Sequence, residues 1–192
     1  MDLGCGRGRS SVYLNRQGYD VTGVEIDLPT LHHAQQLNRE NDGSCAFVRA
    51  DGRSLCFREE RFDYVISFGS TLSEKYRLWM ERKDRLEVIS EAVRVTRSRG
   101  VVVVNFVHRF WNFRHFLSFM RYYVDWARER LFRKRTELGD YTEVIGSVPV
   151  RFHAFTIREA LRLFPKKGVR LTVWKRHKGL FSDWFFVTAR KT

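Results

Sequence analysis

The glycine-rich segment at residues 2–8 contains the residues with the clearest chemical use. It reads Asp2-Leu3-Gly4-Cys5-Gly6-Arg7-Gly8, and a helix-forming stretch follows from Ser10 to Leu14. Glycines at alternate positions allow a tight turn between a strand and a helix, and without Cβ atoms a ligand can approach the backbone. The segment therefore predicts a ligand site, and the alternative is a plain glycine-rich turn.

The spacing of the glycines indicates which ligand to expect. A dinucleotide loop follows the pattern G-x-G-x-x-G, but Arg9 stands where its third glycine would be, which disfavours NAD. Glu25 ends a β-branched stretch 17 residues after Gly8. That separation is close to the roughly 20 residues expected for a carboxylate that accepts ribose hydroxyl hydrogens. A nucleoside ligand is expected, and a surface carboxylate is the alternative for Glu25.

A second acid follows the next predicted strand. Phe47-Val48-Arg49-Ala50 is predicted as a strand, and Asp51 with Gly52 follows at its C-terminal end. Because parallel strands place their carboxyl ends at one edge of a sheet, these residues are expected beside the glycine segment. Asp51 could accept a hydrogen bond from an adenine amino group.

The elements that must position these residues alternate along the first half of the chain. Short β-branched stretches separated by helical patterns are typical of a parallel sheet covered by helices. The predicted strands are Tyr19–Ile26, Cys45–Arg49, Tyr64–Phe68 and Val101–Val107. The predicted helices are Arg9–Arg16, Leu28–Arg39 and Asp84–Thr96.

The end of the chain has a different pattern. Thr156-Ile157-Arg158-Glu159 is a capping box that would begin a helix, and Pro165 with Gly168 would end it. Val169–Lys175 and Trp184–Ala189 then predict two strands joined by a turn at Lys178-Gly179. Their short separation favours an antiparallel hairpin at the sheet edge, because a parallel crossover needs a dozen or more residues.

Several motifs together resemble those of the class I S-adenosylmethionine-dependent methyltransferases, of the type 11-like kind. They cover most of residues 1 to 107 and comprise Asp2–Gly8, Val24-Glu25-Ile26-Asp27, Ala50-Asp51-Gly52 through Phe57, Phe62–Ser67, and Ala92–Thr96 before Arg99-Gly100. The resemblance implies an α/β fold: a Rossmann-like, mostly parallel sheet flanked by helices, with an antiparallel C-terminal hairpin strand.

The resemblance also implies S-adenosyl-L-methionine as cofactor and a role for each matching residue. Gly4, Gly6 and Gly8 would approach its methionine part, Glu25 the ribose, and Asp51 with Gly52 the adenine. Asp2 would help to orient the amino group, and Ser67 would line the site at the end of the fourth strand. The expected cofactor-binding set is Asp2, Gly4, Cys5, Gly6, Gly8, Glu25, Ile26, Asp51, Gly52 and Ser67.

The sequence departs from the family pattern in two places. The family's first strand usually begins several residues before the acid that matches Asp2, so the fold is expected to be N-terminally clipped. Glu25 stands where the family more often has aspartate, which keeps the acceptor and lengthens its reach.

Length and composition indicate a single domain over residues 1–192. We expect a cofactor-binding half at 1–107, a basic aromatic insertion at 108–155, and a terminal helix and hairpin at 156–192. A hydrophobic fraction of 43% excludes wholesale disorder.

The longest aliphatic run is Val101–Val104, and no signal-peptide pattern follows Met1, so a cytoplasmic protein, at most peripheral to a membrane, is expected. Cys5, Cys45 and Cys56 match no disulfide or zinc pattern.

The positive charge lies in the second half of the chain. Residues 1–100 hold 16 basic and 15 acidic side chains, whereas residues 101–192 hold 19 and 7. Residues 109–135 predict an amphipathic helix whose arginines recur every seven residues at Arg114, Arg121, Arg128 and Arg135. Three interpretations stay open for it: a lid over the substrate pocket, attachment to an anionic membrane surface, or RNA binding.

Catalytic candidates are few. A methyl group on a sulfonium needs a nucleophile in line with it, so positioning can suffice without a base. His108 and His153 are the candidates for a base. His32-His33 has no ligand spacing to a carboxylate or cysteine, so no metal is expected.

The sequence favours methyl transfer to a small organic or lipid-like acceptor. The alternatives are an RNA (tRNA) methyltransferase and a non-catalytic nucleotide-binding or membrane-associated module.

Overall fold

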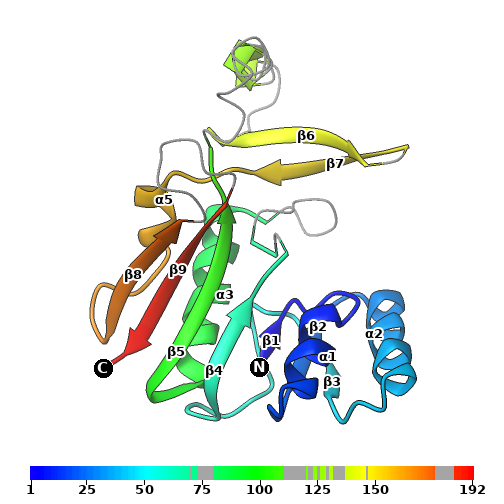
Figure 1. The fold of residues 1–192 in the computed structure, drawn as a ribbon. Helices are drawn as coiled ribbons and strands as arrows, with labels where there is room; N and C mark the ends of the chain where they lie inside the picture. Colours follow the sequence, from blue (N-terminus) through cyan, green and yellow to red (C-terminus); the bar gives the residue numbers. More distant parts are fainter. Residues whose placement is uncertain are drawn as a thin grey trace.

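A seven-stranded sheet forms the centre of the protein (Figure 1). The computed structural model describes residues 1–69, 71–72, 80–109, 120, 123–124, 126–128, 130–131, 137–145, 147–175 and 184–192. The sheet has the order β3-β2-β1-β4-β5-β9-β8. Its strands are β1 (Asp2–Leu3), β2 (Thr22–Glu25), β3 (Ala46–Arg49), β4 (Phe62–Ser67), β5 (Thr96–Val107), β8 (Val169–Lys175) and β9 (Trp184–Lys191). The strands from β1 to β5 pair in parallel, as expected for the mostly parallel sheet.

Helices cover both faces of this sheet (Figure 1). They are α1 (Arg9–Arg16), α2 (Leu28–Glu40), α3 (Arg82–Val95) and the short α5 (Ile157–Leu161). Three of them begin at a capping side chain. Asp27 accepts the amide hydrogen of Thr30 at the start of α2, Glu81 with Asp84 forms a capping box at α3, and Thr156 with Glu159 forms the predicted one at α5. The predicted helices of the first half are therefore confirmed to within two residues at each end.

The C-terminal strands run as predicted. β9 pairs antiparallel with β5 and also with β8, which lies at the edge of the sheet. The predicted hairpin turn at Lys178-Gly179 lies outside the described residues.

Two elements between β5 and β8 differ from the sequence prediction. The helix expected up to Pro165 ends at Leu161, because Leu163 and Phe164 leave the helical path and are buried in the core. An antiparallel hairpin, β6 (Asp140–Ile145) with β7 (Val148–His153), was not predicted. Pro149 lies within β7, and proline in a β-branched stretch argues against a strand unless it lies at a sheet edge, as it does here.

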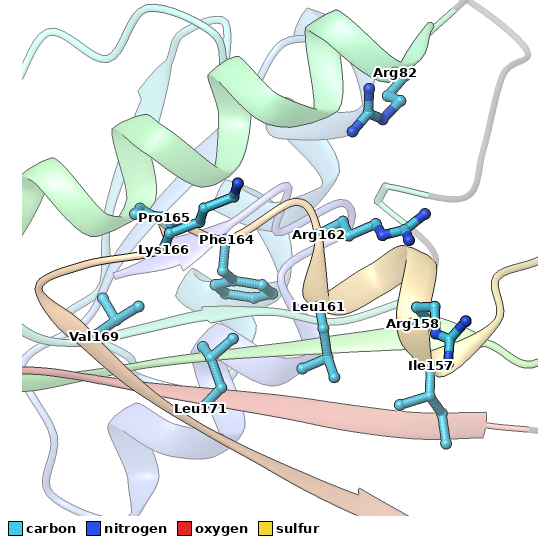
Figure 2. Close-up of a pocket in the computed structure, with 10 residues that line it drawn as sticks. All are labelled: Arg82, Ile157, Arg158, Leu161, Arg162, Phe164, Pro165, Lys166, Val169 and Leu171. Carbon is cyan, nitrogen blue, oxygen red and sulfur yellow. The ribbon is translucent and has the colours of Figure 1, made fainter.

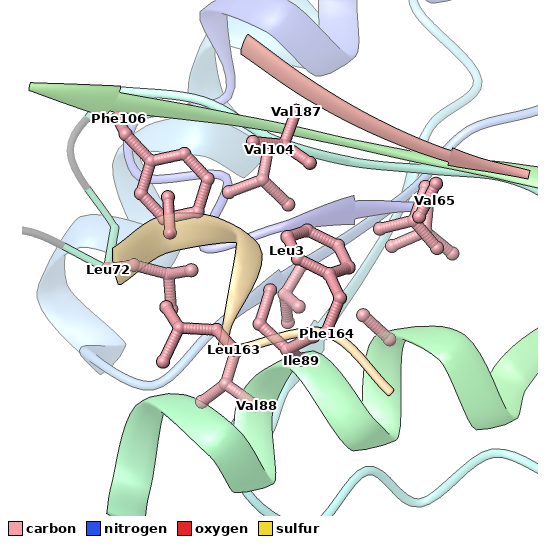
Figure 3. Packing of buried hydrophobic residues seen from close by; sticks show 14 of the residues in the cluster. Leu3, Val65, Leu72, Val88, Ile89, Val104, Phe106, Leu163, Phe164 and Val187 are labelled. Carbon is pink, nitrogen blue, oxygen red and sulfur yellow. The ribbon is translucent and has the colours of Figure 1, made fainter. Parts of the chain in front are cut away.

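The core packs the middle of the sheet against α3 (Figure 3). Leu3, Val65 and Val104 come from three adjacent strands, and Val88 and Ile89 come from α3; each is at most 3% exposed. Burying an aliphatic side chain of this size contributes roughly 1.5–3 kcal/mol. This packing fixes β1, β4 and β5 against one helix and so fixes the edge of the sheet at which they end.

Candidate functional site

The residues expected to bind a ligand gather at the carboxyl ends of four parallel strands. β1 is paired with β2 and β4, and β2 with β3, all in parallel. The segments that follow these strands therefore leave the sheet at the same edge. The glycine loop, Glu25, Asp51 and Ser67 all lie there, at the place where open parallel sheets bind ligands.

The three glycines of the loop differ in what they allow. All have positive φ, at 70° for Gly4, 54° for Gly6 and 78° for Gly8. A Cβ atom on Gly4 would lie 2.4 Å from Cγ2 of Thr71, and one on Gly8 would lie 2.8 Å from Cβ of Ala34. A Cβ atom on Gly6 would meet nothing within 4 Å. Gly4 and Gly8 thus serve the close packing of the turn, whereas Gly6 leaves the backbone open to a ligand.

Glu25 connects the end of β2 to the glycine loop. Its Oε2 accepts the amide hydrogen of Gly6 at 3.1 Å, and its Oε1 accepts those of Ile26 at 2.8 Å and Asp27 at 3.0 Å. An ionised carboxylate has about four acceptor positions, so the group retains capacity for hydroxyl hydrogens of a ligand. The placement fits the expected ribose contact.

Asp2 is buried beneath the loop. Its Oδ2 accepts the hydroxyl hydrogen of Ser11 at 2.6 Å, which connects the end of β1 to α1. Burial raises the pKa of the Asp2 carboxyl. Cys5 is also buried, and burial raises the pKa of its thiol. Its expected place in the cofactor-binding set stays a prediction. The proposed contact of Asp2 with the amino group of a ligand stays a prediction.

Asp51 is held by an arginine that the sequence analysis did not single out. The Arg53 guanidinium donates to both carboxylate oxygens of Asp51, with Nη2–Oδ2 at 2.7 Å, and to Oδ1 of Asp84 at 3.1 Å. Hydrogen bonds from Arg53 lower the pKa of Asp51. An adenine amino group would therefore share the Asp51 carboxylate with Arg53. Gly52 lies against the core, because a Cβ atom there would be 3.3 Å from Cδ1 of Leu3.

Two buried polar atoms near the ends of β4 and β5 have no hydrogen-bond partner in the described part of the chain. They are Oγ of Ser67, which is 3% exposed, and Oδ1 of Asn105, which is 9% exposed. Buried polar groups are nearly always satisfied, so these two atoms are candidates for contact with a bound ligand. Ser67 was expected to line the site. Asn105 was not, although an amide within the valine-rich stretch 101–107 could have drawn attention to it.

His108 and His153, the two candidates for a base, are both buried beside Phe155. They are 6% and 2% exposed. Nδ1 of His153 lies 2.7 Å from Oδ1 of Asp140, its direct partner across the β6–β7 hairpin. Burial leaves neither ring with more than a small surface for an acceptor in the described arrangement, so their catalytic role stays a prediction.

The His153–Asp140 pair belongs to an ionic network that sequence reasoning missed. Glu137 lies 3.7 Å from His153, and Nη1 of the buried Arg85 donates to Glu137 at 2.9 Å. Donor atoms of Glu137, Asp140 and His153 lie within 4.8 Å of one another, which is compatible with a metal ion. Arg85 already supplies a fixed positive charge to Glu137, and this opposes a second cation. We interpret the network as a clamp between the hairpin and α3.

The basic insertion is described only in part. Its described residues between Met120 and Leu131 are helical, and Arg128 is exposed, whereas Arg114, Arg121 and Arg135 lie outside the described residues. Nε1 of Trp126 donates to the carbonyl oxygen of Glu137 at 3.1 Å. Within the described part of the chain, no helix has the length and apolar character needed to cross a membrane.

Comparisons with known proteins agree with this geometry. Residues 1–100 match a family described as a methyltransferase domain. Malonyl-[acyl-carrier protein] O-methyltransferase of Salmonella typhimurium is 32% identical over 102 residues, which are 53% of this chain and 36% of that protein. Putative methyltransferase YqeM of Bacillus subtilis is 26% identical over 103 residues, which are 54% of this chain and 40% of that protein. The matched part therefore spans less than half the length of either curated relative.

A solved structure shows the same fold over nearly the whole chain. A SAM-dependent methyltransferase from Methanosarcina mazei superposes with a TM-score of 0.78 at 22% identity, covering 99% of this chain and 90% of the other. The likeness extends through β6 to β9, beyond the residues that the family match covers.

Proposed function

Because the chain belongs to the class I S-adenosylmethionine-dependent methyltransferases, we propose that it transfers a methyl group from S-adenosylmethionine to a small organic or lipid-like acceptor. The family membership gives the methyl donor. The acceptor and the residues that bind the donor are our proposal, which the geometry at the carboxyl edge of the sheet supports.

One observation carries the proposal: Gly6 is open to a ligand while Glu25 binds its amide. The positive φ of Gly6, the empty space where a Cβ atom would lie, and the carboxylate 3.1 Å from its nitrogen occur together at the start of α1. A ligand with hydroxyl groups fits here, because it can contact the bare backbone and the remaining acceptor positions of Glu25 together.

The chain's own task is to bind and orient. When bound, the cofactor supplies an electrophilic methyl group, so the reaction needs an acceptor atom held in line with it. Glu25 would hold the ribose, Asp51 together with Arg53 the adenine, and Asp2 the amino group. The hydroxyl of Ser67 would contact the ligand at the end of β4. No proton transfer is required where the acceptor atom is already electron-rich.

Two half-buried aromatic rings near the ends of β4 and β5 support an apolar acceptor. Phe68 follows β4 and Phe186 lies in β9, and the two rings meet edge to face with their centroids 5.9 Å apart. Such rings exclude water and suit an organic molecule. The acceptor in the name of the Salmonella relative, malonyl-[acyl-carrier protein], is also an organic group.

Calorimetric titration with S-adenosylhomocysteine tests the cofactor site directly. We expect saturable binding by the unmodified chain and at least about tenfold weaker binding by Gly6→Ala, because the added methyl group occupies the open space and disturbs the loop. Gly18→Ala is the matched control: Gly18 also has positive φ, at 89°, with nothing within 4 Å of its Cβ position, but it lies in the turn after α1. Equal loss of affinity in both variants would contradict the assignment.

The acceptor is tested by incubating the chain with methyl-labelled cofactor and three separate pools: small metabolites, extracted lipids and transfer RNA. Labelling in either of the first two pools supports the proposal. Labelling only of RNA would favour the second candidate, an RNA methyltransferase, which the net charge of +12 over residues 101–192 supports. Cofactor binding without labelling of any pool would favour a non-catalytic nucleotide-binding module.

A further inference from the structure

A groove lies between the start of α3, α5 and β8, away from the residues to which the proposed function assigns a role. It encloses about 860 Å³, which falls within the range of small-molecule sites, about 300–1,000 Å³. Figure 2 shows the side chains that line it, which come from the start of α3, from α5 and the segment after it, and from β8.

The groove is separate from the cofactor site. In the sheet order, β8 is the fourth strand beyond β1, which carries the glycine loop. Neighbouring strands lie about 4.8 Å apart, so the two strands are roughly 19 Å apart across the sheet. The part of the groove formed by β8 therefore lies well away from the strand that carries the glycine loop.

One side of the groove is apolar. Ile157 and Leu161 of α5 face Val169 and Leu171 of β8, with Phe164 between them (Figure 2). The four aliphatic side chains are only half-buried, whereas Phe164 is 4% exposed. A continuous apolar strip of this kind suits an alkyl chain, since covering it removes further apolar surface from water.

The other side of the groove is cationic. Arg82, Arg158, Arg162 and Lys166 are exposed, and none of these four side chains forms an ion pair in the described part of the chain. The described lining includes no acidic residue. By contrast, five other arginines each have a carboxylate partner: Arg53, Arg85, Arg94, Arg97 and Arg109. Four cations without an ion-pair partner around one groove attract an anion, and a bound anion lowers the repulsion among them.

We propose that this groove binds a single-chain anionic amphiphile, an alkyl chain that carries a phosphate monoester. The chain would lie on the apolar strip from Ile157 to Leu171, and the phosphate would contact Arg158 and Arg162. A phosphate monoester carries about −1.5 to −2 charges at neutral pH and three acceptor oxygens, so it compensates several cations better than a carboxylate does. Arginine pairs with such a group through two parallel hydrogen bonds.

The apolar strip distinguishes this ligand from a nucleic acid. Phosphates of RNA would meet the cations but would leave Val169, Leu171 and Leu161 uncovered. Stacking of bases requires exposed aromatic rings, and the only ring in the described lining, Phe164, is buried.

Calorimetric titration with dodecyl phosphate, below the concentration at which it forms micelles, tests the proposal. We expect saturable binding of one molecule per chain. Inorganic phosphate and the neutral dodecyl maltoside should each bind at least about tenfold more weakly, because the first lacks the alkyl chain and the second lacks the anionic group. The affinity for dodecanoate, which carries a single charge, should lie between theirs and that for dodecyl phosphate.

Paired variants locate the site. Arg158→Gln with Arg162→Gln should weaken dodecyl phosphate binding by at least about tenfold, while the affinity for S-adenosylhomocysteine stays unchanged. The matched control removes the same charge at exposed positions of α1 and α2, through Arg16→Gln with Arg39→Gln, and should leave both affinities as they are. Circular dichroism spectra of both pairs establish that the chains fold.

Three results would overturn the proposal. The first is an equal loss in both variant pairs, which would show non-specific attraction to the net charge. The second is equal affinity for dodecyl phosphate and inorganic phosphate, which would show that the alkyl chain does not contribute to binding. The third is no binding of dodecyl phosphate by the folded chain, with adsorption only to RNA or to vesicles of phosphatidylglycerol.

Discussion

Glu25 has two structural tasks at the cofactor edge, because one carboxylate both holds the Gly6 amide and presents acceptor oxygens to a ligand. We expect Glu25→Ala to weaken binding of S-adenosylhomocysteine by about 1–3 kcal/mol, through loss of charge-assisted hydrogen bonds. Calorimetry on this variant is compared with Glu87→Ala, which removes an exposed carboxylate from α3. Unchanged affinity in Glu25→Ala would contradict the ribose assignment.

The Asp51–Arg53 pair makes a pH-dependent contribution to stability. Hydrogen bonds from Arg53 lower the pKa of Asp51 in the folded chain, so the pair stabilises the fold above the ordinary aspartate pKa, and this stability is lost as the pH falls through the lowered value. Both side chains are about a third exposed, so the contribution is below about 1 kcal/mol. Urea unfolding should show Arg53→Met less stable than the unmodified chain at pH 7, with the difference shrinking as the pH falls below the ordinary aspartate pKa. A difference that does not shrink would assign the effect to packing.

Single residues were predictable from the sequence where a local spacing fixes their place. Gly4, Gly6, Gly8 and Glu25 follow from the order of strand, turn and helix, and the structure places them together as expected. The partner of Asp51 was not predicted, although Arg53 is only two residues away, because an exposed arginine can point in many directions. Asp140 and His153 become neighbours only through the hairpin, which the sequence did not reveal.

At the scale of elements, the β6–β7 hairpin is joined to α3 through the buried Arg85. Its guanidinium donates to Glu137 and to the carbonyl oxygen of Met80, and lies 5.3 Å from the ring of Phe155. We expect Arg85→Met to lower the free energy of unfolding by about 2–4 kcal/mol, because it removes one partner of a largely buried pair. The control is Arg97→Met, which breaks the exposed pair with Asp63 and should cost at most about 1 kcal/mol. Urea unfolding measures both, and equal losses would show that the clamp adds nothing.

The elements of the first half were predictable because each carries its own boundary signals. α1 and α2 begin after Gly8 and Asp27, as predicted. In the second half, β8 also has the predicted bounds. The capping box at Thr156 predicted the start of α5. The β6–β7 hairpin and the end of α5 were not predictable, because long-range contacts decide them. α5 ends at Leu161 because Leu163 and Phe164 are buried in the core. β7 was not predicted because Pro149 lies within it, and proline argues against a strand.

At the scale of the whole molecule, the positive charge is unevenly divided between the two halves of the chain. The first half nets +1 and holds the proposed cofactor site, whereas the second nets +12. Replacing Arg114, Arg121 and Arg128 with glutamine should leave the affinity for S-adenosylhomocysteine unchanged. It should weaken binding to anionic vesicles or RNA several-fold, because a chain with fewer arginine contacts releases fewer counterions when it binds.

Filter binding and vesicle sedimentation at two salt concentrations measure this effect. The control removes three exposed arginines from the first half: Arg16, Arg39 and Arg58. If both triple variants lose affinity equally, the total charge explains binding and the insertion has no special part in it.

The antiparallel pairing of β9 with β5 has a consequence for how the protein is made. Val101–Val107 of β5 pairs with residues 184–190, which a ribosome synthesises some 80 residues later. Until then the growing chain presents an open strand edge of buried valines, to which another nascent chain could add a strand. Completion of β9 removes this hazard, so a chain that ends before Trp184 should aggregate during expression, although its glycine loop, Glu25 and Asp51 are all present.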